Sequence, residues 1–105
     1  MEELELICLQ IISNAGEARS QCMEAMKAAR EGRRSEANAF IKEAEERMKA
    51  AHDVHTKLIT MDAGGELGAA RLILVHSEDI MMGAEITKDV AKEVVCVYEK
   101  IGEMK

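Results

Sequence analysis

Within residues 73–82, His76 and Asp79 interrupt an otherwise apolar stripe of an expected helix, and they are the best candidates for chemistry in this sequence. Counting in steps of three and four residues places His76 and Asp79 one turn apart on one stripe of an expected helix. The other members of this stripe are Leu72, Gly83, Ile86, Val90, Val94, Val97, Ile101 and Met104. An imidazole can act as a nucleophile, and carboxylates at Glu78 and Asp79 could fix its tautomer and charge. His76 could equally be a core histidine.

Asp79 is harder to explain as simple packing. An ionised carboxylate in an apolar seam is costly, and it tends to be protonated, paired or bound to a cation. Asp79 could therefore set the register between packed helices, contribute to a metal site of clustered carboxylates, or do both.

The remaining histidines, His52 and His55, are three residues apart and would face a similar side of their helix. Together with His76 and nearby acids they could form a metal site within a helical bundle. The sequence lacks the repeated Glu-x-x-His pattern of di-iron bundles and the paired cysteines of zinc sites, which disfavours a catalytic transition-metal centre.

Composition indicates one small helical domain. The chain has 105 residues with no proline, eight methionines and only two aromatic residues, and its net charge is −6. This acidity and the scarcity of aromatics disfavour a nucleic-acid partner. An acidic start and the lack of an apolar run of about 20 residues predict a cytoplasmic protein. The three cysteines are expected to be buried free thiols.

Three long helices are expected to position these residues. Apolar spacing predicts helices over residues 3–30, 35–62 and about 70–104, with the first two antiparallel. Gly32 is placed to end the first helix and Ser35 to cap the second. Gly16 suggests a close approach by another backbone, and the glycines at 64, 65 and 68 suggest a hinge.

The third helix would be about 50 Å long, which is too long for one small bundle to cover. We therefore predict a homo-oligomer in which the third helices of several copies pack at a common axis.

Three segments together point to a known family. They are residues 14–20 (NAGEARS), Ala51-His52 with Thr56-Lys57-Leu58-Ile59, and the pattern Val75-His76-x-x-Asp79-x-x-Met82. In order and spacing the chain resembles, over nearly its whole length, the enzyme IIA component of the bacterial phosphoenolpyruvate-dependent sugar phosphotransferase system, of the lactose/cellobiose/chitobiose type.

The resemblance implies an all-α fold, a single IIA-type domain over residues 1–105. It forms an antiparallel three-helix bundle that assembles as a homotrimer around its third helices. It also implies a phosphotransferase component of sugar uptake. His76 would accept a phosphoryl group from the histidine-containing phosphocarrier protein and donate it to a cysteine of the cognate enzyme IIB, with an indirect link to the membrane permease IIC. Asp79 matches an acidic residue that surrounds a divalent cation such as magnesium on the threefold axis, and no organic cofactor is implied.

Three positions depart from the family pattern. The family usually reads His-x-Gln-Asp-His, whereas this chain has Glu78 and Ile80, and His55 stands where the second helix usually has Gln. Glu78 would repel a phosphohistidine, whereas Gln would donate a hydrogen bond to it. We hypothesise that His55 offsets the charge of Glu78, with His52 as a further supporting residue. The alternatives are a helical interaction protein that has lost phosphorylation and a metal-binding helical bundle.

Overall fold

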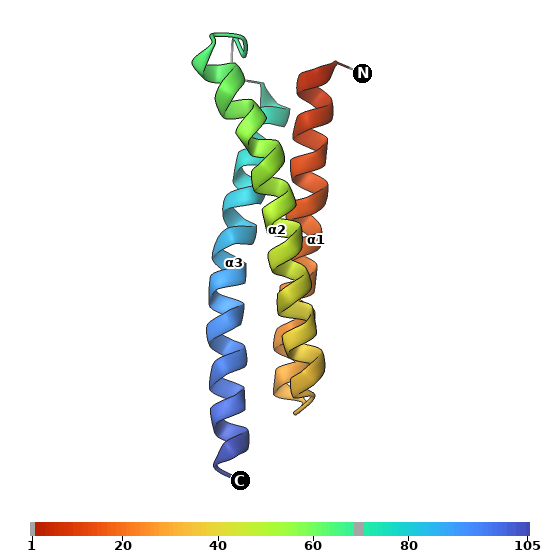
Figure 1. Cartoon of the computed structure of the whole chain (residues 1–105), viewed down its shortest axis with the longest axis vertical. Coiled ribbons are helices and arrows are strands. Elements are labelled where there is room, and N and C mark those ends of the chain that lie inside the picture. The colour runs from red at the N-terminus through yellow and green to blue at the C-terminus, as the bar shows by residue number, and fades with distance from the viewer. Residues whose placement is uncertain (1, 69–70) are drawn as a thin grey trace.

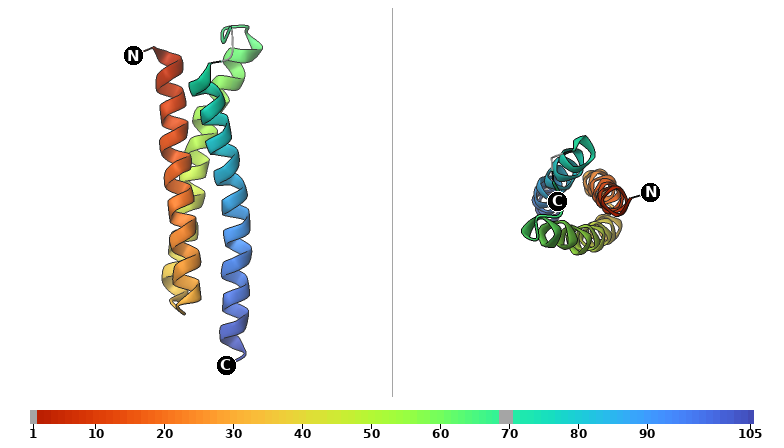
Figure 2. Two further views of the ribbon diagram at one scale, coloured as in Figure 1. Left: turned by 180° about the vertical axis from the view of Figure 1, so that it is seen from behind. Right: turned by 90° about the horizontal axis from the view of Figure 1, so that it is seen from above.

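Three α-helices, each antiparallel to the next along the chain, make up the part of the chain that the computed structural model describes, residues 2–68 and 71–105. They are α1 (Glu3–Arg30), α2 (Arg34–Ala63) and α3 (Leu72–Glu103), and the described residues contain no strand (Figure 1). Seen end-on, the helices surround a common core, and α3 extends beyond the other two at its C-terminal end (Figure 2). The bundle measures 57 × 20 × 19 Å, so the expected elongated all-α bundle is confirmed.

Glycines end the first two helices. Gly32 has a φ of +77°, and Arg33 N–H donates to the carbonyl of Ala28 at 2.9 Å, which closes α1 in a Schellman motif. Gly65 ends α2 in the same way, with a φ of +74°. The first glycines of the expected hinge therefore terminate a helix. Ser35 does not cap α2, because the helix starts one residue before it and Arg33 occupies the N-cap position. The expected start of the third helix at residue 70 lies outside the described residues.

Small side chains let the helices pack closely. Most of the buried face of α1 is alanine and cysteine, and the largest fully buried side chains are Ile11 and Met48. Two neighbouring hydrophobic clusters, one toward each end of the bundle, form the core. Ser77 is the one buried polar residue among those described, and its hydroxyl donates to the carbonyl of Leu74 at 2.8 Å.

Two expectations about packing are wrong. Cys96 is exposed, whereas Cys8 and Cys22 are buried free thiols as expected. A Cβ atom added at Gly16 would meet nothing within 4 Å, so no backbone approaches it closely inside one copy. Periodicity identifies the apolar face of a helix. How much of that face the neighbouring helices cover depends on how the helices are placed.

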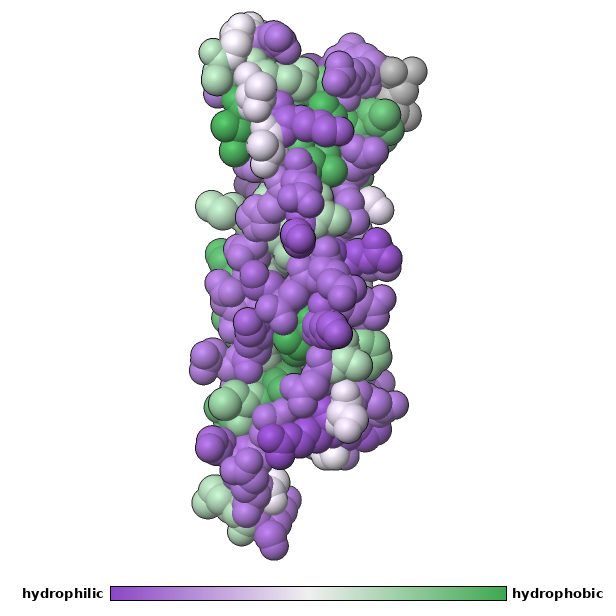
Figure 3. All heavy atoms as spheres, in the orientation of Figure 1, coloured by the Kyte–Doolittle hydropathy of each residue, from purple (hydrophilic) through white to green (hydrophobic). Residues whose placement is uncertain are grey.

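The apolar stripe of α3 that contains His76 and Asp79 faces away from the core. The core face of α3 is instead formed by Ser77, Met81, Ala84, Ala91 and Val95. Exposed members of the stripe are Leu72 (85%), Ile86 (60%), Val90 (52%), Val97 (55%), Ile101 (43%) and Met104 (85%). By contrast, the face seen in Figure 3 is mainly hydrophilic, with smaller hydrophobic patches in its middle and at its edges. One copy therefore leaves an apolar row along α3 without a covering partner.

Within the described residues, the helices are too polar for any of them to serve as a membrane span.

Candidate functional site

His76 lies in the first turns of α3, in the groove between α1 and α3. Its imidazole is exposed and borders a depression whose other lining residues are Leu9, Ile12, Arg71, Leu72 and Ile73. Within the described part of the chain the ring makes no hydrogen bond. The expectation that Glu78 or Asp79 fixes its tautomer is therefore wrong for a single copy, and the ring offers an accessible nitrogen in an apolar setting.

Arg71 fixes the start of the helix that carries His76. This N-cap residue of α3 donates to a Glu5 carboxylate oxygen at 2.9 Å and also contacts the carboxylate of Glu2. Its hydrogen bond to Glu5, and then the charge of Glu2, raise the pKa of the Arg71 guanidinium above its usual value. The bridge ties the start of α3 to the start of α1 at one end of the groove. The sequence did not lead us to predict this role, although Arg71 directly precedes the apolar start of the helix.

Asp79 lies one turn beyond His76 in the same groove. It is exposed and borders a second depression, which is also lined by Gly16, Arg19, Ser20, Met23, Ile80 and Gly83. Among the described residues neither Asp79 nor Arg19 takes part in an ion pair. A carboxylate thus stands in the middle of an exposed apolar stripe. Its oxygens are the hard ligands that magnesium and calcium prefer, but one copy supplies a single such residue there.

Glu78 faces the other side of α3. It follows His76 by two residues, about 200° around the helix, so the two side chains do not face each other. The carboxylate instead contacts His55 on α2, with 2.6 Å between Glu78 Oε1 and His55 Nε2. Because an ionised carboxylate can only accept, the ring nitrogen donates its proton in this contact. The predicted pairing of His55 with Glu78 is present, but on the opposite flank of α3 from His76.

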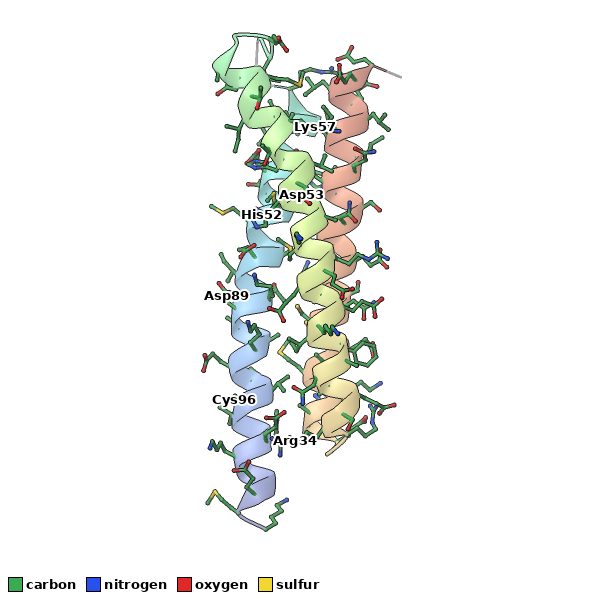
Figure 4. All side chains as sticks on the ribbon, viewed as in Figure 1. Arg34, His52, Asp53, Lys57, Asp89 and Cys96 are labelled. Carbon is green, nitrogen blue, oxygen red and sulfur yellow. The ribbon has the colours of Figure 1, made fainter. Side chains whose placement is uncertain are left out.

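His52, which is labelled in Figure 4, makes a similar contact further along the same seam. Its Nε2 lies 2.9 Å from Glu85 Oε2, and Lys88 Nζ donates to Glu85 Oε1 at 2.9 Å. The hydrogen bond from Lys88, followed by that from His52, lowers the pKa of the Glu85 carboxyl group. The seam between α2 and α3 is therefore held by polar pairs as well as by apolar packing.

The histidines do not converge on one point. His52 and His55 each pair with a carboxylate in the seam between α2 and α3, whereas His76 lies in the groove between α1 and α3. The part of the chain that the structure describes brings together no group of three or more histidine, cysteine and acidic residues. The alternative of a metal-binding bundle built from the three histidines of one copy is therefore wrong.

Curated relatives match almost the full length of the chain. The lichenan-specific phosphotransferase enzyme IIA component of Bacillus subtilis (strain 168) is 42% identical over 104 residues, which are 99% of this chain and 94% of that protein. The N,N'-diacetylchitobiose-specific EIIA component of Escherichia coli (strain K12) is 35% identical, over 95% of this chain and 86% of that protein.

Solved structures share the fold. A cellobiose-specific enzyme IIA from Bacillus anthracis superposes with a TM-score of 0.94 at 35% identity, covering 100% of this chain and 96% of that one. A chain in the solution structure of the IIA(Chitobiose)–HPr complex superposes with a TM-score of 0.84 at 32% identity, covering 97% of this chain and 99% of that chain.

Residues 6–99 also match the family described as "PTS system, Lactose/Cellobiose specific IIA subunit". This match includes His76, Asp79 and both histidines of α2. The chain therefore belongs to the lactose/cellobiose-specific IIA subunits of the sugar phosphotransferase system.

Proposed function

We propose that this protein is a phosphocarrier of sugar uptake that accepts a phosphoryl group on His76. The donor is the histidine-containing phosphocarrier protein HPr, and the acceptor is a cysteine of the cognate enzyme IIB, which serves a membrane permease IIC. The observation that carries the proposal is the exposed imidazole of His76 in an apolar depression on a long, well-anchored helix. A IIA structure bound to HPr among the structural relatives supports the choice of donor.

The chemistry needs little beyond this arrangement. The P–N bond of the donor phosphohistidine breaks as a new P–N bond forms to a ring nitrogen of His76, so positioning and charge stabilisation supply most of the catalysis. Leu9, Ile12 and Leu72 surround the ring with apolar surface against which a partner protein can dock. Arg71 holds this corner of the bundle in place through Glu2 and Glu5.

We further propose that the active form is a homotrimer with α3 at the threefold axis. The exposed apolar stripe of α3 supports this assembly, because burying it would remove six large side chains from water. Three copies of Asp79 would then meet, and their carboxylate oxygens would hold one divalent cation such as magnesium. This cation would offset the repulsion between the three carboxylates.

Intact mass spectrometry tests the carrier function. The protein is incubated with phosphoenolpyruvate, enzyme I and HPr, beside a His76→Ala control and an established IIA. We expect an acid-labile gain of one phosphoryl group per chain that is absent in the control. No gain under conditions where the established IIA is fully modified would overturn the proposal and favour a helical interaction protein that has lost the relay.

A further inference from the structure

Arg71 and His76 line the same depression between α1 and α3. The other residues that the structure places around it are apolar: Leu9, Ile12, Leu72 and Ile73. Arg71 is therefore the one described residue at this depression that carries a permanent charge. His76 follows it by five residues, about 7.5 Å along the helix, and helical side chains lean toward the N-terminal end of their helix. The imidazole therefore leans toward the end of the depression where Arg71 lies.

Two glutamates at the start of α1 hold Arg71 in this structure. Its Nη2 donates to Glu5 Oε1 at 2.9 Å, and its Nη1 contacts Glu2 Oε1. All three side chains are accessible to water, with 41% of Arg71, 35% of Glu5 and 55% of Glu2 exposed. Exposed ion pairs are weak, and the long arginine side chain has many rotamers. Arg71 can therefore leave the glutamates for a stronger anion nearby.

We propose that Arg71 is the charge partner of phosphorylated His76. When the phosphoryl group arrives, the guanidinium leaves Glu2 and Glu5 and donates hydrogen bonds to the phosphoryl oxygens instead. The inference rests on the proposed carrier function. It adds a phosphoryl-binding residue that belongs to the same chain as the accepting histidine, and it makes the two glutamates competitors of the phosphoryl group.

The charge that arrives with the phosphoryl group drives the exchange. The P–N bond of phospho-HPr breaks with its electron pair left on the donor imidazole, and the lone pair of a His76 ring nitrogen forms the new P–N bond. One proton passes through water from the His76 ring to the donor ring. The phosphoryl group brings about two negative charges to the depression, whereas each glutamate carries one. A guanidinium can also donate two parallel hydrogen bonds to it.

The equilibrium constant for phosphoryl exchange with HPr, measured by intact mass at low ionic strength, tests the role of Arg71. Arg71→Met removes the charge and keeps an apolar stem, and we expect the constant to fall about tenfold, because the hydrogen bonds to the phosphoryl group are lost. Arg71→Lys keeps a charge without the paired donors, so its constant should lie between those of R71M and the wild type. A lysine variant no better than R71M would overturn the inference.

Glu5→Gln separates phosphoryl binding from a structural role. If Arg71 served only to anchor α3, weakening its bridge to α1 would leave the constant unchanged or lower it. As a competitor of the phosphoryl group, Glu5 should instead lower the constant, so we expect E5Q to raise it about threefold. In the R71M background E5Q should have no effect. An unchanged or lower constant in E5Q, or the same rise in both backgrounds, would overturn the inference.

Arg33→Met is the matched control. Arg33 is also the residue before a helix, α2, and its guanidinium also donates to two glutamates, Glu31 and Glu36. It lies at the opposite end of the bundle from the start of α3 (Figure 1). R33M therefore removes the same charge and the same kind of bridge, and it should leave the constant unchanged. A fall equal to that of R71M would overturn the inference.

The experiment also distinguishes the inference from the proposed function. A phosphorylated wild type that R71M matches would overturn the inference alone. A wild type that is never phosphorylated would overturn the proposed function and, with it, this inference. If R71M melts well below the wild type, E5Q decides the question, because it keeps Arg71 and predicts a gain rather than a loss.

Discussion

Val97→Asp is expected to dissociate the proposed trimer without unfolding the bundle. Val97 lies on the α3 stripe and is 55% exposed in one copy. Burying a whole valine side chain contributes about 1.5 to 3 kcal/mol, so covering this exposed half contributes about 1 kcal/mol per copy and about 3 kcal/mol per trimer. Three aspartates brought together at the axis cost at least about 3 kcal/mol more. The sum of about 6 kcal/mol weakens assembly by about four powers of ten.

Sedimentation equilibrium at micromolar concentration measures the assembly, and far-UV circular dichroism reports the helices. We expect the wild type at the mass of three chains and V97D at the mass of one, with equal helix content. Ala39→Asp adds the same charge on an exposed position of α2 and should leave the trimer intact. A monomeric wild type, or a V97D protein that still sediments as three chains, would refute the argument that the stripe is an interface.

Gly32→Ala should lower the free energy of unfolding by about 1 kcal/mol in urea denaturation, because Gly32 has a φ of +77° and alanine resists that conformation. Gly102→Ala should cost nothing, since an added Cβ there meets no atom within 4 Å and the residue is helical; equal losses in both would contradict the argument. The lowered pKa of Glu85 predicts a stabilisation that is complete above the carboxyl group's ordinary value of 4.5 and is lost as the pH falls through the lower folded value. Lys88→Met should reduce this pH dependence of the melting temperature; an unchanged acid limb would show that the hydrogen bond to Lys88 does not cause it.

Much of the fold follows from local sequence pattern. The spacing of apolar residues predicts all three helices to within a few residues, and Gly32 marks the first helix end because only glycine readily adopts the conformation it needs. The prediction that Ser35 caps α2 was wrong, since α2 begins one residue earlier, at Arg34, and no side-chain hydrogen bond caps it. Such end effects depend on a few backbone hydrogen bonds that periodicity does not encode.

The candidate site divides in the same way. The residue types and spacing around His76 and Asp79 identify where chemistry is expected, and family membership confirms the type of protein. The neighbours of each group were not predictable from spacing. Glu78 is two residues from His76 in sequence, yet the helix turns it toward His55 on α2.

The sequence by itself therefore determined three helices and their apolar faces, because helical periodicity is a local property. It also determined one apolar stripe that His76 and Asp79 interrupt. Only the tertiary structure decided which face of α3 the bundle covers. Ala84 and Ala91 are buried there because α1 and α2 pack closely against small side chains, and the stripe with the larger side chains Ile86 and Val90 is left exposed. That choice separates His76 from the pair of His55 and Glu78, since opposite flanks of one helix cannot meet inside a single copy.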